Sequence, residues 1–220
     1  MKISVAIDGP AGAGKSTIAK LVGKKYNLMY INTGAMYRAV ALKSKENNLS
    51  PDNVTAICNL IDTMEMHFEN DDLILNGENI QEKITMPEIS SIVSAYASIP
   101  EVRVMLVKLQ RDMSEKFNVI MDGRDIGTVV LKNASFKFFL TASAEERANR
   151  RYKELQERKV DCSYEQILND IISRDYQDSN RITDPLKKAD DAIEIDSTSL
   201  DINGVVNVIN KYIEEKLNTK

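Results

Sequence analysis

The 220-residue sequence predicts an α/β fold in which helices flank a five-stranded parallel sheet. Two observations lead to this prediction. Short apolar runs alternate along the chain with amphipathic segments, a pattern typical of strands joined by helical crossovers. The runs are almost continuously apolar, so we expect both faces of each strand to be covered. The five expected strands are 2–7, 28–31, 118–121, 136–140 and 192–195.

The expected helices begin at marked positions. Four segments carry a Ser or Thr followed three residues later by Glu or Gln, a pair that can satisfy free backbone N–H groups at a helix start. These pairs are Thr85/Glu88, Ser98/Glu101, Ser143/Glu146 and Ser163/Gln166. Apolar stripes at helical spacing comprise Val102, Met105, Leu106, Leu109 and Met113 in one helix, and Ile202, Val205, Val206, Ile209 and Ile213 in the last.

Two segments depart from this alternation and are candidate flaps over a site. Residues 64–84 contain short β-like pieces separated by Asn-Asp-Asp and Asn-Gly turn signals, which predict a small antiparallel insertion. His67, the only histidine, lies in it and fits a surface residue better than a catalytic base. The charge-dense stretch 145–159 contains Arg147, Arg150, Arg151 and Arg158.

Composition narrows the function classes. A net charge of −4 argues against a nucleic-acid binder that works through overall basicity, but not against a small anionic ligand held by a few arginines. Two distant cysteines, Cys58 and Cys162, suggest no disulfide framework and a reducing compartment. No signal peptide or membrane-spanning stretch is recognisable, so we expect a cytoplasmic location. The length favours one domain, with two small domains as the alternative.

Residues 9–16, GPAGAGKS, fit the phosphate-loop pattern G-x-x-x-x-G-K-[ST], with an expected strand before them and an expected helix after them. Glycines let backbone N–H groups turn inward around phosphate oxygens, and the helix N-terminus adds a favourable dipole. Lys15 would reach the β- and γ-phosphates, and the Ser16 hydroxyl would ligate Mg²⁺. The alternative, a plain Gly-rich turn with a surface lysine, is disfavoured by the flanking strand and helix. The loop predicts nucleoside triphosphate binding but does not specify the reaction.

Three polar clusters follow expected strands: the phosphate loop, residues 32–38 (NTGAMYR) and residues 122–127 (DGRDIG). In open parallel sheets ligands bind at the carboxyl ends of the strands, so these clusters should share a site. Asp122 ends an apolar run, where a carboxylate holds Mg²⁺ directly or through water; otherwise it would begin an Asp-Gly turn. For Arg124 and Asp125 a local ion pair or a helix cap is an equally good interpretation.

Other charged residues are less distinctive from sequence alone. A lone arginine such as Arg38 is more often solvated. Arg103 lies in the first turn of its helix, where the dipole disfavours a cation and a ligand partner would offset that cost. Arg174, Asp178 and Arg181 share one helix face, and the simplest interpretation is a surface ladder worth about 0.3–0.5 kcal/mol per pair.

Nearly end to end, the sequence resembles the bacterial cytidylate kinases, a branch of the nucleoside monophosphate kinases. The resemblance rests on IDGPAGAGKST (7–17), TGAMYR (33–38), MDGRDIGTVV (121–130), SRDYQDSNR (173–181) and DDAIEIDST (190–198). It implies a single P-loop kinase domain with a core at 1–62 and 117–220, a monophosphate-binding insertion at about 63–116 and a helical lid at about 147–170. It also implies transfer of phosphate from ATP, with Mg²⁺, to cytidine monophosphate (CMP) or deoxycytidine monophosphate (dCMP).

The same resemblance assigns roles to individual residues. ATP would bind through Gly9, Pro10, Ala11, Gly12, Ala13, Gly14, Lys15, Ser16 and Thr17, with Arg147 and Arg151 approaching it from the lid. Ser94, Arg103 and Asp125 would read the cytosine edge. Arg38, Arg124 and Arg181 would hold the acceptor phosphate, Arg174 and Asp178 would lie near the sugar, and Thr33 and Tyr37 would complete the acceptor site. Catalysis would depend on Lys15, Asp122, Arg124 and Arg181, and the metal would be held by Ser16 and Asp122. One departure is Asn32, where many relatives have Asp.

This interpretation explains why no general base is evident. A monophosphate has a second pKa near ~6, so its oxygen is already anionic at neutral pH and the barrier is repulsion between two phosphates. Arginines, Lys15 and Mg²⁺ would neutralise that repulsion. We expect a monomer whose partners are ATP and CMP or dCMP, without nucleic acid or membrane. The alternatives are a kinase of the same fold acting on another nucleoside monophosphate or small metabolite, and, more distantly, a nucleotide-driven switch.

Overall fold

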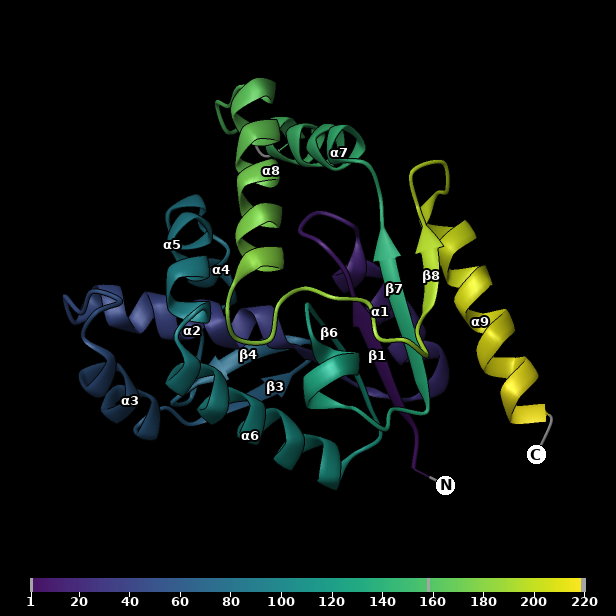
Figure 1. The fold of residues 1–220 in the computed structure, drawn as a ribbon, viewed down its shortest axis with the longest axis horizontal. Helices are drawn as coiled ribbons and strands as arrows, with labels where there is room; N and C mark the ends of the chain where they lie inside the picture. The colour runs from purple at the N-terminus through teal and green to yellow at the C-terminus, as the bar shows by residue number, and fades with distance from the viewer. Residues whose placement is uncertain (1, 158, 219–220) are drawn as a thin grey trace.

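The computed structural model describes residues 2–157 and 159–218 (Figure 1). Its main sheet has the strand order β2-β6-β1-β7-β8, and every pairing is parallel. The strands are β1 (Ser4–Asp8), β2 (Met29–Asn32), β6 (Val119–Gly123), β7 (Phe136–Thr141) and β8 (Ile193–Asp196). The five predicted strands and their parallel arrangement are confirmed.

Helices cover both faces of this sheet (Figure 1). Apart from a short helix in the insertion, the described α-helices are α1 (Lys15–Tyr26), α2 (Thr33–Glu46), α3 (Val54–Asp62), α5 (Pro87–Ala97), α6 (Pro100–Lys116), α7 (Ala144–Glu157), α8 (Tyr164–Asn180) and α9 (Ile202–Asn218). Along β1, Val5 and Ile7 pack in a cluster with residues of α1 and α9, whereas Ala6 packs in a cluster with α2 and α6. Successive strand residues therefore enter two different apolar layers, which is why the strand sequences are continuously apolar.

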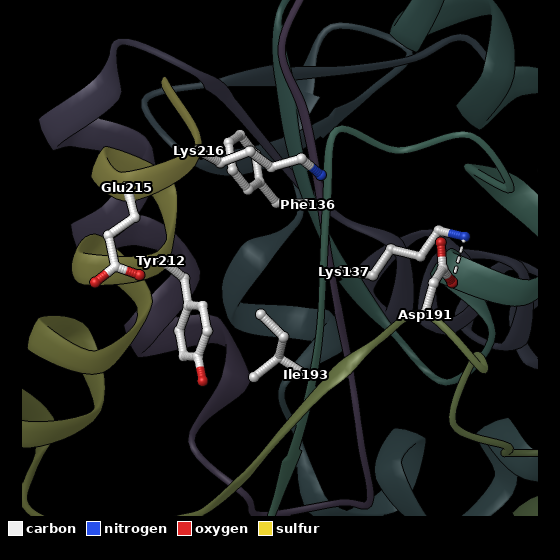
Figure 2. A pocket seen from close by; sticks show the side chains of 7 residues that line it. All are labelled: Phe136, Lys137, Asp191, Ile193, Tyr212, Glu215 and Lys216. Carbon is white, nitrogen blue, oxygen red and sulfur yellow. Dashed lines mark hydrogen bonds and ion pairs between the residues drawn. The ribbon is translucent and has the colours of Figure 1, made fainter. Parts of the chain in front are cut away.

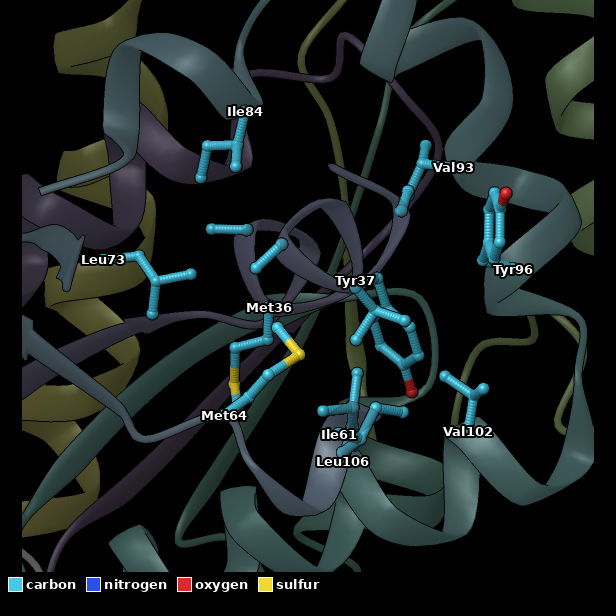
Figure 3. Packing of buried hydrophobic residues seen from close by; sticks show 14 of the residues in the cluster. Met36, Tyr37, Ile61, Met64, Leu73, Ile84, Val93, Tyr96, Val102 and Leu106 are labelled. Carbon is cyan, nitrogen blue, oxygen red and sulfur yellow. The ribbon is translucent and has the colours of Figure 1, made fainter. Parts of the chain in front are cut away.

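The segment between α3 and α5 forms the predicted antiparallel insertion. It contains β3 (Met66–Glu69), β4 (Asp72–Leu75), β5 (Glu78–Asn79) and the short helix α4 (Gln81–Ile84), and both strand pairings are antiparallel. Leu73 of β4 and Ile84 of α4 join the cluster that contains Met36 of α2 and Leu106 of α6 (Figure 3). The insertion thus shares the core of one helical layer. His67 is exposed on β3, as expected.

Two of the four predicted helix caps are correct. The Ser143 and Ser163 hydroxyls accept the backbone N–H groups of residues 146 and 166, at the starts of α7 and α8. Thr85 and Ser98 instead end the preceding helices, and their hydroxyls donate to carbonyl groups there. The helices after them begin with a proline in the first turn, where a missing N–H costs nothing and the fixed φ suits a helix.

Helices α7 and α8 form a unit with a small apolar core of its own, built on Ala148, Leu155, Ile167 and Ile171. Helix α7 begins just after β7, at the carboxyl edge of the sheet, and α8 returns to contact α5 (Figure 1). The α6 stripe is buried or partly buried, and in α9 only Ile202 departs from the predicted stripe, because it is half exposed at the helix start. Among the described helices, none is long and apolar enough to cross a bilayer. Cys58 and Cys162 are free thiols.

Candidate active site

The polar segments that follow β1, β2 and β6 meet at one edge of the sheet. The strand register pairs Asp8 with Gly123 and Asn32 with Asp122, so the last residues of the three strands lie side by side. Parallel strands end at a common edge, and this edge carries the phosphate loop. The predicted convergence of the three clusters is therefore confirmed.

The phosphate loop is held by close backbone contacts. Gly9 has φ 147°, and a Cβ there would lie 1.9 Å from the carbonyl oxygen of Leu140 on β7, so only glycine fits. Gly14 adopts a left-handed conformation immediately before α1. The Lys15 ammonium donates to the carbonyl of Pro10 at 2.7 Å and is buried. Burial, and then the nearby Arg124, lower the pKa of Lys15.

Two oxygen ligands suited to Mg²⁺ lie side by side at the loop. The Ser16 hydroxyl donates to Asp122 Oδ2 at 3.0 Å, and the Tyr30 hydroxyl donates to Asp122 Oδ1 at 2.8 Å. Mg²⁺ is usually bound through one or two protein oxygens, with phosphates and waters completing its coordination, so this pair fits the ion. No cluster of three or more His, Cys, Asp or Glu residues that could enclose a metal occurs in the described parts of the chain.

Four cations gather beside the loop: Lys15, Arg38, Arg124 and Arg174. Arg124 lowers the pKa of each of the other three, after burial, which is the larger cause in every case. The Nε atoms of Arg38 and Arg174 are buried and have no hydrogen-bond partner among the described residues. Arg38 is therefore not the solvated charge that its sequence context favours. Buried donors without a protein acceptor match a ligand that brings several oxygens.

The charged face of α8 is part of this site, so its interpretation as a surface ladder is wrong. Asp178 is buried, and it accepts a hydrogen bond from Arg124 Nε at 2.8 Å. Burial alone would raise the pKa of Asp178, but Arg124 and Arg174 outweigh it and lower that pKa. Arg181, just after the helix, reaches Asp125 at 3.3 Å instead of extending a ladder. These partners lie far apart in sequence, which is why spacing alone missed them.

A second group of charges surrounds Arg103, which is only 1% exposed. Its Nη2 binds Asp125, its Nε donates to Asp184 at 3.0 Å, and its guanidinium lies over the Tyr37 ring, 5.6 Å from the centroid. Asp125 therefore pairs with Arg103 and Arg181 rather than with its neighbour in sequence or a helix end. Burial raises the pKa of Asp125 although both arginines oppose that shift.

Arg147 connects the unit of α7 and α8 to the phosphate loop. Its Nη1 donates to the carbonyl of Ala11 at 2.9 Å, its Nε donates to Ala142, and its Nη2 lies 2.6 Å from Asp175 on α8. Arg151, one turn later, pairs with Glu154 at 2.7 Å and is partly exposed. Arg158 lies outside the described residues. Arg147 thus acts on the backbone of the loop in this structure.

Comparison with known proteins identifies the family. The sequence profile described as cytidylate kinase matches residues 5–215. The chain belongs to the cytidylate kinase family. A cytidylate kinase of Clostridium perfringens is 68% identical over 97% of this chain and 98% of its own, and one of Clostridium acetobutylicum is 58% identical over 99% and 100%.

Solved structures support the fold. A shikimate kinase from Bacteroides thetaiotaomicron matches 97% of this chain and 99% of its own with a TM-score of 0.51 at 12% identity. An uncharacterized protein from Eubacterium ventriosum matches 98% and 99% with a TM-score of 0.53 at 15% identity. At such identities the likeness concerns the fold alone, and the predicted P-loop kinase fold is confirmed.

The other residues that we expect to bind substrate differ in their contacts and in their exposure. The Thr33 hydroxyl donates to the backbone carbonyl of Asp122 at 2.6 Å and ties α2 to β6. Asn32 accepts the N–H of Ala35 at 3.0 Å, so the change from Asp preserves a helix cap. Ser94 is half-buried on α5 and Thr17 is exposed on α1. Roles for Thr17, Thr33 and Ser94 in binding substrate stay predictions.

Three structurally important residues were not singled out from the sequence. The Asp8 carboxylate accepts the N–H groups of Ile126 and Gly127, both at 2.7 Å, and so fixes the segment after β6 to the phosphate loop. Its position directly before the loop was the available signal. Tyr30 and Asp184 carried no such signal, because their partners, Asp122 and Arg103, lie 92 and 81 residues away.

Proposed function

We propose that this protein transfers the γ-phosphoryl group of ATP to CMP or dCMP and releases ADP. Membership of the cytidylate kinase family supports the acceptor base. The observation that carries the proposal is the pair of buried Nε donors on Arg38 and Arg174, two arginines that interact with each other, with Arg174 also close to Lys15. They suit the oxygens of a second phosphate next to the phosphate loop.

The charges divide the proposed site into two parts. On the phosphate side, four cations lie close together, and the carboxylates of Asp8, Asp122, Asp175 and Asp178 lie around them. The cations offset the repulsion between the acceptor phosphate and the γ-phosphate, which is the main barrier to their approach. The acceptor oxygen is already anionic at neutral pH, so the site needs no side chain to remove a proton.

The chain's own groups have distinct proposed roles. Lys15 and the loop backbone bind the ATP phosphates, while Arg38, Arg124 and Arg181 orient the acceptor phosphate. Ser16 and Asp122 would hold Mg²⁺, which supplies further neutralisation of the phosphate charge when bound. Arg103, Asp125 and Ser94 would recognise the cytosine edge, with Arg174 and Asp178 near the sugar.

The larger segments have proposed roles too. Residues of about 63–116 would bind the monophosphate, and residues of about 147–170, including Arg147 and Arg151, would close over ATP and exclude water, an alternative acceptor. We also propose a monomer in the cytoplasm, where a reducing environment would keep the two free thiols reduced.

A coupled assay of ADP release across acceptors tests the proposal. CMP and dCMP should stimulate ADP release strongly, and Lys15→Ala should abolish nearly all of it while circular dichroism shows an intact fold. If another nucleoside monophosphate or a small metabolite stimulates ADP release more strongly, that compound is the acceptor instead. Slow hydrolysis that no acceptor stimulates would instead favour a nucleotide-driven switch and refute phosphoryl transfer.

A further inference from the structure

Asp184 lies in the segment that connects α8 to β8, and it contacts Arg103, assigned to the cytosine edge, and Arg181, assigned to the acceptor phosphate. Its Oδ2 accepts a hydrogen bond from Arg103 Nε at 3.0 Å, and its backbone carbonyl accepts one from Arg181 Nε at 2.7 Å. The residue has φ 48°, a left-handed conformation that aspartate adopts more readily than most residues. The segment is anchored nearby, because Leu186 N–H donates to the carbonyl of Asp178 at 2.8 Å.

With Asp184 in place, acceptors from three separate parts of the chain bind the Arg103 guanidinium. Nε binds Asp184, Nη2 binds Asp125, and Nη1 donates to the carbonyl of Ala97 at 3.2 Å. A planar guanidinium bound on three nitrogens has a fixed orientation. Asp184 holds the Nε edge, which neither of the other two acceptors contacts.

Asp184 also balances the charge of the ion-paired side chains around Arg103. Arg103 and Arg181 carry two positive charges, and Asp125 and Asp184 carry two negative charges. These four side chains together are therefore neutral and suit an uncharged base. Without the Asp184 carboxylate they would hold one uncompensated positive charge, and a buried Arg103 N–H would lose its acceptor.

We infer that Asp184 is a positioning residue for acceptor recognition: it fixes the orientation of Arg103, which in turn contacts the base. This inference rests on the proposed function. Asp184 acts through Arg103 and does not belong to the residues assigned to the substrate, and the sequence pattern assigned it no role. Its side chain is 28% exposed, against 1% for Arg103, so a substitution can be accommodated at the surface without opening the core.

A matched control lies in the same connecting segment. Asp191 binds the buried Lys137 at 2.8 Å, so it too is a carboxylate that pairs with a buried cation (Figure 2). It lies next to Phe136 and Ile193, the first residues of β7 and β8, at the opposite edge of the sheet from the phosphate loop. Asp191→Asn therefore removes a carboxylate that pairs with a buried cation but contacts neither Arg103 nor Arg181.

The experiment compares steady-state kinetics of wild type, Asp184→Asn and Asp191→Asn, with CMP and ATP varied in turn. We expect Asp184→Asn to raise KM for CMP by about fivefold or more, because a charge-assisted hydrogen bond becomes one to a neutral amide oxygen, while KM for ATP changes less than twofold. Asp191→Asn should leave both unchanged. Asp184→Ser replaces the asparagine variant if that variant does not fold.

The outcomes separate the two proposals. Equal changes in both KM values, or kinetics like those of Asp191→Asn, would overturn the positioning role while wild-type turnover of CMP upholds the proposed function. Absence of CMP-dependent turnover in wild type would refute the proposed function and, with it, this inference.

Discussion

Asp8→Asn tests the energetics of the carboxylate that joins the phosphate loop to the segment after β6. Asp8 is buried and accepts two backbone N–H groups. Burial raises its pKa from 3.8 to about 6, and the two hydrogen bonds oppose that shift without cancelling it. The asparagine keeps the size of the side chain but has one acceptor oxygen, so its NH₂ group would face a backbone N–H.

The raised pKa fixes the sign of a pH effect. The folded protein binds a proton at Asp8 more readily than the unfolded chain does, so the stability from this proton is fully present below about pH 3.8 and is lost as pH rises through about 6. Between pH 7.5 and pH 5, these two pKa values change the unfolding free energy of wild type by about 1.4 kcal/mol, a factor of about ten in the folding equilibrium. Asp8→Asn lacks this contribution.

The assay is urea denaturation of both proteins at pH 7.5 and pH 5, with linear extrapolation to water. The difference between wild type and Asp8→Asn isolates Asp8, because the other titrating groups are common to both. Wild type should gain about 1.4 kcal/mol relative to the variant on acidification. If the difference in unfolding free energy between the two proteins is the same at both pH values, the two hydrogen bonds cancel the effect of burial on the pKa. If it is smaller at pH 5, they outweigh that effect. Either result would show that the reasoning is wrong.

Two further predictions concern the phosphate loop. Gly9→Ala should lower Tm far more than Gly77→Ala, because both glycines have positive φ but only at residue 9 would the new Cβ meet a backbone oxygen, at 1.9 Å; similar Tm losses in thermal unfolding would contradict this. Arg147→Met should raise KM for ATP several-fold more than KM for CMP, because it leaves a carbonyl of the phosphate loop without its donor. Arg150→Met on the same helix should not, because the Arg150 side chain binds residues 146 and 197 instead. Equal kinetic effects of the two variants would exclude an action of Arg147 on the loop.

The fold was predictable where one kind of interaction decided the outcome. Strands such as β1 and β6 are apolar on both sides because each side packs against a layer of helices. Such a strand therefore appears in the sequence as a run of consecutive apolar residues. The helix starts after Thr85 and Ser98 were misplaced by one residue because a proline inside the motif competes with the hydroxyl for the first turn. The motif is compatible both with a hydroxyl cap and with a proline in the first turn, so the sequence alone does not reveal which of the two starts the helix.

The candidate site was predictable to the extent that its residues follow strands. Lys15 was found from the phosphate-loop pattern and Asp122 from its position after β6, since the carboxyl ends of parallel strands must meet. Position alone left Arg124 between a functional role and a local ion pair or helix cap. The fates of Arg38 and Asp178 depend on which distant element covers them, and no spacing along one helix reports that. Asp178 is buried on the packed α8 and Arg38 has a buried Nε, whereas the residue pattern predicted a charged surface face and a solvated charge.

Burial without pairing is itself the feature that gives the phosphate side its proposed chemistry. A carboxylate opposite every arginine would have stabilised the free protein, but it would have competed with an incoming phosphate for the same donors. Asp178 is placed on Arg124, while the Nε donors of Arg38 and Arg174 are left to a ligand. The base side has the opposite arrangement, with Arg103 fully paired by Asp125 and Asp184. We therefore expect affinity for the phosphates to fall steeply with salt, and discrimination between bases to depend on it far less.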